Sequence, residues 1–219
     1  MKRYYASLFA SLFIGGMFQP SAHAQDTPGL SVGGFVERRT DNKINGDELS
    51  FNYYGIRLKA RDERFFDGFV DLGLQPMDFG SYNANEAGSF GLGGTLWLLR
   101  AEDVVIPLDI GIYGSYHIAD YTLKDAAGHQ TDAKYGRYMA QVVFRTEGYG
   151  EVRPYLRAGV LGSKLDPDDD SVISSKDLDQ IEPAVNVGFE ISLGEKAVIS
   201  VEGNYSQSVG GAVHLDYWF

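Results

Sequence analysis

A serine, a histidine and an aspartate near the end of the chain are the residue types that a hydrolase needs. Val209-Gly210-Gly211 is typical of a tight hairpin loop, and a three-residue loop there would place Ser206 opposite His214 on the next strand. Asp216 would share a face with His214, because strand side chains alternate. His214 would then accept the Ser206 proton while a carboxylate orients its ring. The sequence identifies no oxyanion donor, so lipid or ester hydrolysis is an alternative, and we expect no catalytic residues and no enzyme.

An acidic tract around residue 170 offers the oxygen ligands that calcium prefers. Acids occupy the first, third, fifth and twelfth places of an EF-hand-like loop, namely Asp166, Asp168, Asp170 and Asp177. Ser171 stands where that loop needs glycine for its sharp turn, and Asp177 replaces the longer glutamate that chelates through both oxygens. We therefore predict a solvated acidic loop and no cofactor or metal, with calcium or magnesium binding in the loop as the alternative.

Charged residues of both signs recur at alternate positions of several segments, so they would share one face of each strand. The acids of this predicted network are Glu37, Asp67, Asp71, Asp109, Glu182, Glu190, Glu202 and Asp216, and the bases are Arg57, Lys59, Arg61, Arg137, Arg145, Arg153 and Arg157. Inside a narrow barrel these groups would pair across the lumen, which favours a plugged interior over a wide aqueous pore. A thin channel that selects ions or small solutes is the alternative.

The elements that must position these side chains are strands with apolar residues at every second place. Ten such segments are predicted, at residues 30–38, 49–61, 66–77, 89–99, 106–118, 134–145, 152–163, 181–193, 197–208 and 212–219. The second is irregular, because Leu49 and Phe51 do not join the apolar face formed by Tyr54, Ile56 and Leu58. A bulge or a hairpin extended above the membrane would explain this slip.

Connector lengths alternate between short and long, as a transmembrane meander requires. Short turns are predicted at 61–65, 100–104, 146–151 and 194–196, and long polar loops at 40–48, 78–87, 120–133 and 165–180. The fold class that follows is all-β, a transmembrane antiparallel up-and-down β-barrel of about ten strands, with eight as the alternative. An even number of strands would bring both termini to the same side.

The last segment combines alternation with an aromatic carboxy-terminus. Val213, Leu215, Tyr217 and Phe219 share one face of it. This pattern resembles the closing-strand signal of bacterial outer-membrane proteins, and the chain resembles small outer-membrane β-barrels of the OmpA, OmpX and OmpW general kind. The resemblance implies that the barrel-assembly machinery reads these four residues during insertion. It also implies surroundings of outer-membrane lipid and lipopolysaccharide.

The opposite end of the chain is typical of a cleaved secretory signal peptide. Lys2 and Arg3 precede an apolar run over residues 4–18, and Ala22-His23-Ala24 comes before Gln25. We therefore predict a signal peptide at 1–24 and the barrel at 25–219. The chain contains no cysteine, which excludes a bacterial lipid anchor and a disulfide framework.

The formal net charge of −11, without a basic stripe, excludes nucleic acid as a partner. The predicted function is an integral protein of the cell outer membrane with a structural, surface-interaction or narrow-pore role. A soluble periplasmic all-β binding protein is the alternative fold, because soluble sandwiches and barrels also alternate. The sequence identifies no solute, no host target and no oligomeric state.

Overall fold

The structure is a computed structural model that describes residues 29–44, 47–62, 64–80, 82–103, 107–146, 151–169, 179–206 and 209–219. The predicted signal peptide at 1–24 lies outside the described residues. The elements in chain order are β1 (Gly29–Ile44), β2 (Asp47–Arg61), β3 (Phe66–Gln75), β4 (Met77–Phe79), β5 (Tyr82–Ala84), β6 (Ala87–Leu99), the short 3₁₀ helix η1 (Ala101–Asp103), β7 (Leu108–Lys124), β8 (Gln130–Thr146), β9 (Val152–Pro167), β10 (Asp179–Leu193), β11 (Ala197–Tyr205) and β12 (Val209–Trp218). Within these ranges, no helix has the length and hydropathy that crossing a bilayer would need.

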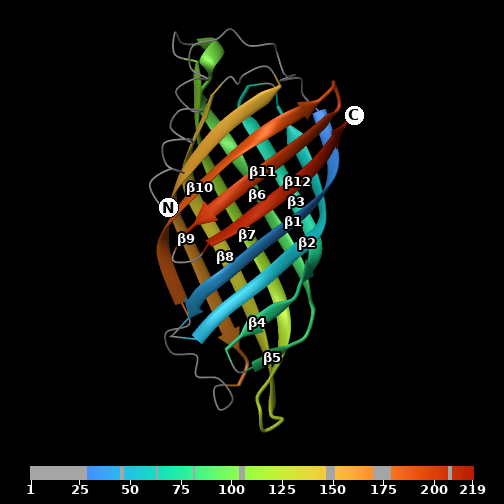
Figure 1. The fold of residues 1–219 in the computed structure, drawn as a ribbon, viewed down its shortest axis with the longest axis vertical. Helices are drawn as coiled ribbons and strands as arrows, with labels where there is room; N and C mark the ends of the chain where they lie inside the picture. The colour runs from blue at the N-terminus through green and yellow to red at the C-terminus, as the bar shows by residue number, and fades with distance from the viewer. Residues whose placement is uncertain are drawn as a thin grey trace, which may run out of the picture.

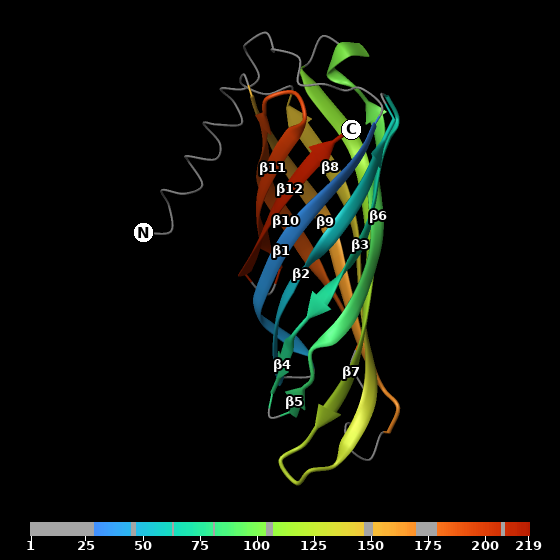
Figure 2. The same ribbon diagram turned by 90° about the vertical axis from the view of Figure 1, so that its right-hand side faces the viewer.

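Ten long antiparallel strands of the described chain close into a barrel. Each pairs with its neighbours in the order β1-β2-β3-β6-β7-β8-β9-β10-β11-β12, and β12 pairs back to β1 from Trp218–Ser31 to Val209–Thr40. The two perpendicular views show these strands tilted and wrapped around one axis (Figures 1 and 2). A closed sheet pairs the backbone groups of every strand, which is the condition for crossing hydrocarbon as β-structure. The predicted barrel of ten strands is confirmed.

The barrel has two different ends. At the first, here called the terminal end, β1 begins and β12 finishes, and the Phe219 N–H donates to the Leu30 carbonyl at 3.0 Å. The turns between β2 and β3 and between β10 and β11 lie at this end, and Gly194 adopts a positive φ of 72° in the second of them. In the first, the Arg64 and Phe65 N–H groups donate to the Asp62 carboxylate, and these hydrogen bonds lower the pKa of Asp62. The other end is called the loop end.

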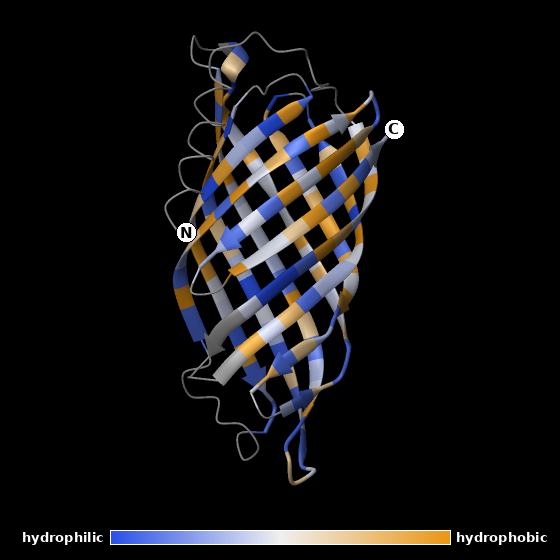
Figure 3. Ribbon diagram, in the orientation of Figure 1, coloured by the Kyte–Doolittle hydropathy of each residue, from blue (hydrophilic) through white to orange (hydrophobic). Residues whose placement is uncertain are grey.

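The outside of the barrel is apolar over its middle. Outward side chains such as Ile56, Leu72, Ile112 and Leu215 are about half exposed, while the alternate positions face inward. Orange, hydrophobic segments accordingly recur along the strands around the cylinder (Figure 3). A soluble barrel would bury this face, because large contiguous apolar surfaces are unfavourable in water. The arrangement therefore argues against the soluble alternative and is typical of a barrel that crosses a membrane.

At the loop end the strands extend further than the sequence predicts. Segment 120–124 of β7 pairs with 130–134 of β8, and β1 pairs with β2 as far as Ile44 opposite Asp47. The loops predicted at 40–48 and 120–133 are therefore wrong in large part, because hairpin pairing continues through them. Polar residues predict a loop in both segments, yet paired strands outside a membrane accept polar side chains on the exposed face.

Two further predicted loops also contain strand structure. Within 78–87, β4 pairs with β2 and β5 pairs with β7, so these short strands bridge β2 to β7 on the loop side of β3 and β6. The predicted loop at 165–180 is shortened from both sides, since β9 continues to Pro167 and β10 begins at Asp179. Residues 170–178 lie outside the described residues.

A charge introduced into the apolar belt tests its contact with lipid. Ile112 is 50% exposed on the outward face of β7. We expect Ile112→Arg to lower the free energy of unfolding in lipid vesicles by ~2–4 kcal/mol, as a charge near the bilayer midplane does. Urea titration of the refolded protein measures this.

The matched control for that substitution is Ala126→Arg, on an exposed side chain at the tip of the β7–β8 hairpin. This variant should unfold like the unmodified protein. Equal stability of the Ile112→Arg and Ala126→Arg proteins would contradict a lipid-facing belt.

Candidate functional site

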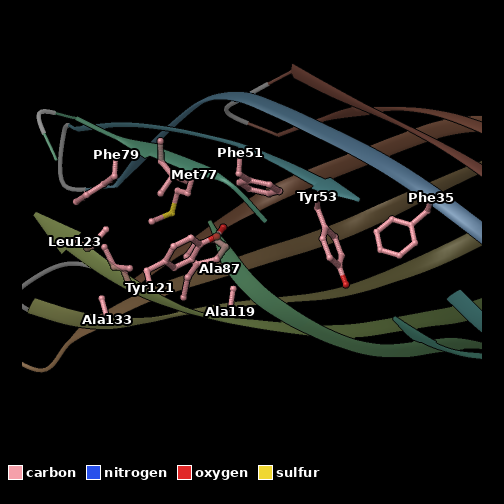
Figure 4. Packing of buried hydrophobic residues seen from close by; sticks show 13 residues of the cluster. Phe35, Phe51, Tyr53, Met77, Phe79, Ala87, Ala119, Tyr121, Leu123 and Ala133 are labelled. Carbon is pink, nitrogen blue, oxygen red and sulfur yellow. The ribbon is translucent and has the colours of Figure 1, made fainter. Parts of the chain in front are cut away.

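The lumen at the loop end is filled by buried apolar side chains, here called the aromatic plug. Each is at most 4% exposed. The plug consists of Phe35, Leu49, Phe51, Tyr53, Met77, Phe79, Ala87, Ala119, Tyr121, Leu123, Ala133, Tyr135 and Leu165. Figure 4 shows that it runs along the lumen, from Phe79 and Leu123 to Tyr53 and Phe35. The plug therefore closes the lumen over several layers of side chains.

Opposite walls of the barrel supply the two sides of the plug. Phe35 and Tyr53 come from β1 and β2. Their ring centroids are 4.5 Å apart in an edge-to-face arrangement, which is a favourable geometry for aromatic rings. Tyr135 lies on β8, and its ring centroid is 5.9 Å from that of Phe51. The Tyr121 hydroxyl donates a hydrogen bond of 2.7 Å to the Gln75 carbonyl, which fixes the ring.

The sequence-based prediction missed the plug. Leu49 and Phe51 fall out of phase with the outward face of β2 because they point into the lumen, in phase with Tyr53, and not because β2 bulges. The irregularity in this hairpin lies instead on β1, between Arg39 and Asn42. The signal that would have revealed the plug is this apolar residue pair on a face that is otherwise polar.

On the terminal side of the plug the lumen holds a cavity of about 140 Å³, here called the charged chamber. Its lining reaches from His117 and Arg137, beside the plug, to Arg61, Trp97 and Trp218 near the terminal end. A volume of this size accommodates several water molecules or one small solute. The chamber is therefore the candidate functional site.

Ion pairs surround the chamber, some of them across the lumen and others within one strand or between neighbouring strands. The Arg137 guanidinium donates two hydrogen bonds, of 2.7 and 2.8 Å, to the Glu37 carboxylate across the lumen. The Arg39 Nε–H donates to the same carboxylate at 2.9 Å. Arg57 makes a second two-pronged pair with Asp71, with both distances 2.6 Å. Paired geometry of this kind offsets part of the cost of burying charge.

Further pairs continue towards the terminal end. Lys59 donates to Asp216, and Arg157 donates to Glu202, which also accepts the Tyr155 hydroxyl at 2.9 Å. The Arg61 Nε–H donates to Asp67 at 2.7 Å, and the Trp97 indole N–H donates to the other Asp67 oxygen at 2.8 Å.

Arg145 is the centre of the remaining contacts. It donates to Asp109 at 2.9 Å and lies 3.8 Å from Glu190 and 3.9 Å from Asp67. The contacts given above thus include thirteen of the fifteen charged residues of the predicted network. The other two are Glu182, which is buried on β10, and Arg153, which is half-buried on β9.

Two cations of the lumen are absent from the predicted network. Arg39 shares Glu37 with Arg137, and Arg100 lies 3.4 Å from Asp109. The position of Arg39 was visible in the sequence, because it lies two residues after Glu37 and so on the same face. Arg100 follows the last residue of β6, where the alternation of side chains no longer indicates which face a residue occupies.

Aromatic rings hold three of the guanidinium groups in place. Arg57 lies 4.0 Å from the Phe69 ring centroid, and Arg157 lies 4.2 Å from that of Tyr113. Arg145 lies 4.1 Å from the Trp97 ring. Each contact is within the range of a cation–π interaction. The chamber therefore presents cations whose orientation is fixed before any solute enters.

The predicted Ser206–His214 pair does not form. In the structure, His214 is opposite Ser200, and Asp216 is opposite Val198, whereas Ser206 follows the last paired residue of β11. The predicted turn at 209–211 is wrong because Gly210 lies inside β12, where a Cβ would clash with Asn204 Oδ1 and would come within 2.5 Å of the Arg38 carbonyl oxygen. Glycine here allows the close approach of the Asn204 side chain and the β1 backbone, and does not mark a turn.

The acidic tract is described only in part, since Asp170 and Asp177 lie outside the described residues. Lys164 and Asp166 form an exposed pair at 3.7 Å. The Asp168 N–H donates to the Asp132 carbonyl at 2.8 Å and ties the end of β9 to β8. Across the described ranges, no three His, Cys, Asp or Glu side chains are grouped as metal ligands.

Comparison with known proteins identifies the fold. No protein-family model and no curated protein matches the sequence. Among solved structures, the translocator domain of the autotransporter NalP from Neisseria meningitidis matches with a TM-score of 0.52 and 11% identity, over 98% of this chain and 95% of that one. The chain has the fold of an outer-membrane β-barrel.

Other outer-membrane barrels match with lower TM-scores. Ail of Yersinia pestis matches at 0.38 with 18% identity, over 88% of this chain and 97% of that one. The outer membrane protease OmpT from Escherichia coli matches at 0.35 with 12% identity, over 88% and 96%. At such identities the likeness concerns the fold alone, so the function must be inferred from the lumen itself.

Removing the carboxylate that two arginines share tests the buried network. We expect Glu37→Gln to lower the free energy of unfolding by ~3–5 kcal/mol, because Arg39 and Arg137 would keep their buried charges without it. Asp166→Asn, which breaks the exposed pair with Lys164, should cost about 1 kcal/mol or less. Urea titration in lipid vesicles measures both, and similar costs for the two variants would contradict a buried network.

Proposed function

We propose that this protein is an integral protein of the outer membrane with a sealed lumen, and that its role is structural and at the cell surface. The observation that carries the proposal is the aromatic plug. Its side chains come from both walls and are at most 4% exposed. Passage of a solute would require displacing rings such as Tyr53, Phe51 and Tyr135, which are at most 2% exposed in a close-packed interior.

The location in the outer membrane follows from the exterior. The apolar belt needs hydrocarbon as its solvent, and closed barrels of this kind cross outer membranes. We infer that lipid and lipopolysaccharide surround the belt and that the barrel-assembly machinery inserts the chain through its last strand. Val213, Leu215, Tyr217 and Phe219 support this, since all four are exposed on one face of the closing segment.

The surface role rests on the strands that continue beyond the belt. The β7–β8 hairpin is paired up to Lys124 and Gln130, and its tip is exposed. The Asp125 carboxylate accepts hydrogen bonds from the His129 backbone N–H and lies 2.9 Å from His129 Nδ1. The side-chain contact lowers the pKa of Asp125 and stabilises a defined tip. A partner would therefore meet a preformed surface.

A selective channel for ions or small solutes is the second candidate, and the charged chamber favours it. A chamber of about 140 Å³ that is lined by charges of both signs would bind an ion or a small solute before it enters a narrow channel. The plug argues against permanent conduction. That the chain is not an enzyme stays a prediction, supported by the separation of Ser206 from His214 in the register of β11 and β12.

Single-channel recording separates the two candidates. We expect the purified protein in planar bilayers to give no discrete current steps, because the plug closes the lumen. Phe51→Ala/Tyr135→Ala, which removes two facing rings of the plug, should produce discrete steps. The matched control is Phe90→Ala/Tyr138→Ala, which removes two exposed rings from the outward face and should stay silent. Conductance steps in the unmodified protein would overturn the sealed-lumen proposal and support the channel.

A further inference from the structure

We propose that the charged chamber is a binding site for a small oxyanion, of the size of phosphate. The site goes beyond the proposed structural role at the cell surface and does not depend on it, because a chamber that binds an anion does so whether or not the plug ever opens. The proposal is carried by the orientation of the ion pairs, by unused donors and by access from the terminal end.

Three ion pairs point their positive partners into the chamber. Arg57, Lys59 and Arg145 belong to the lining. Their partners Asp71, Asp216 and Asp109 are not part of the lining and are at most 8% exposed. Each pair is neutral as a whole, yet its positive end is nearer to a solute in the chamber. The field in the chamber therefore favours an anion.

The lining shows the same excess of positive groups. Its cations are Arg39, Arg57, Lys59, Arg61, Arg137, Arg145 and Arg157, and its acids are Glu37, Asp67, Glu190 and Glu202. The other acids of the network stand outside this lining. An oxyanion would meet more donors than acceptors at the chamber surface.

Some of these donors have no acceptor in the described part of the chain. The Nε–H groups of Arg137 and Arg157 are buried and unpaired there. The Lys59 ammonium has three N–H donors, and Asp216 takes one of them. Buried donors without acceptors are unfavourable unless a solute or water satisfies them. A tetrahedral oxyanion offers several acceptor oxygens at once.

The chamber is accessible from the terminal end. Asp67 and Glu190, in its outer part, keep 24% and 23% exposure, whereas the plug on its other side is sealed. Cation–π contacts to Phe69, Tyr113 and Trp97 hold the guanidinium groups in place. Little side-chain ordering is therefore needed on binding, and such preorganisation favours affinity.

The protein contains a natural probe of this chamber. Its two tryptophans, Trp97 and Trp218, both belong to the lining. We expect the tryptophan fluorescence of the folded protein in detergent micelles to change saturably when sodium phosphate replaces sodium chloride at constant ionic strength. A sulfate titration tests whether the site accepts oxyanions generally. An identical, non-saturating response to phosphate and chloride would overturn the proposal.

Variants that are expected to change the phosphate Kd in opposite directions test the site further. Lys59→Gln/Asp216→Asn removes one inward-pointing pair without leaving a lone charge, and should weaken phosphate binding about tenfold or more. Glu190→Gln removes an acid of the lining and should lower the phosphate Kd severalfold. Arg38→Gln changes an exposed arginine on the outer face of β1 and should leave the Kd unchanged.

Heat-modifiable migration on a detergent gel must show a folded barrel for each variant before its titration is interpreted. If the double variant fails to fold, Arg157→Lys serves in its place, because it keeps the charge beside Glu202 and loses the Nε–H donor. Unchanged phosphate affinity in the folded Glu190→Gln and donor variants would place the fluorescence response outside the chamber and overturn the site.

Discussion

The rest of the structure depends on one constraint, which is that no backbone N–H or C=O can remain unpaired in hydrocarbon. A sheet meets it only by closing, and the pairing of β12 with β1 does so. Closure turns every second side chain outward to lipid and encloses the others in a lumen whose width the strand number fixes. The outward positions can then be uniformly apolar, while the inward positions must fill a narrow cylinder. The lumen is therefore where this sequence is specific.

Ion pairs and aromatic rings fill the lumen, and the ion pairs are of two kinds. Some ion pairs join directly opposed residues of neighbouring strands, as Arg57 with Asp71 and Arg61 with Asp67 do in the β2–β3 register. Others cross the lumen between distant parts of the chain, as Arg137 with Glu37 does. The first kind stabilises a hairpin locally, and the second holds opposite walls together. Aromatic and other apolar side chains then fill the lumen at the loop end.

The alternation of apolar and polar residues in the sequence predicts the strands and their faces. The features that alternation does not determine were missed. The ten long strands, their faces and the inward position of most lumen charges follow from a period of two. The partner of each charge does not, because alternation assigns a face and says nothing about the opposite wall. Gly210 and Gly211 predicted a turn, whereas β12 already includes them, so the register of Ser206 was wrong. The plug was missed because Leu49 and Phe51, inward and apolar, look like an error in the pattern.

The plug and the ion pairs beside it act as one packed unit. The Arg137 guanidinium lies 5.1 Å from the Phe51 ring centroid while it donates both hydrogen bonds to Glu37. His117, 3.2 Å from Asp71, packs edge to face against Tyr53 at 5.5 Å between ring centroids. Moving these rings aside would expose a buried carboxylate to water and would remove the apolar contacts of two arginines. Because breaking a buried pair is costly whereas loosening an exposed one is not, the seal is strongest where rings and charges meet. The terminal half of the lumen, where water already reaches Asp67 and Glu190, is free to bind a solute without disturbing it.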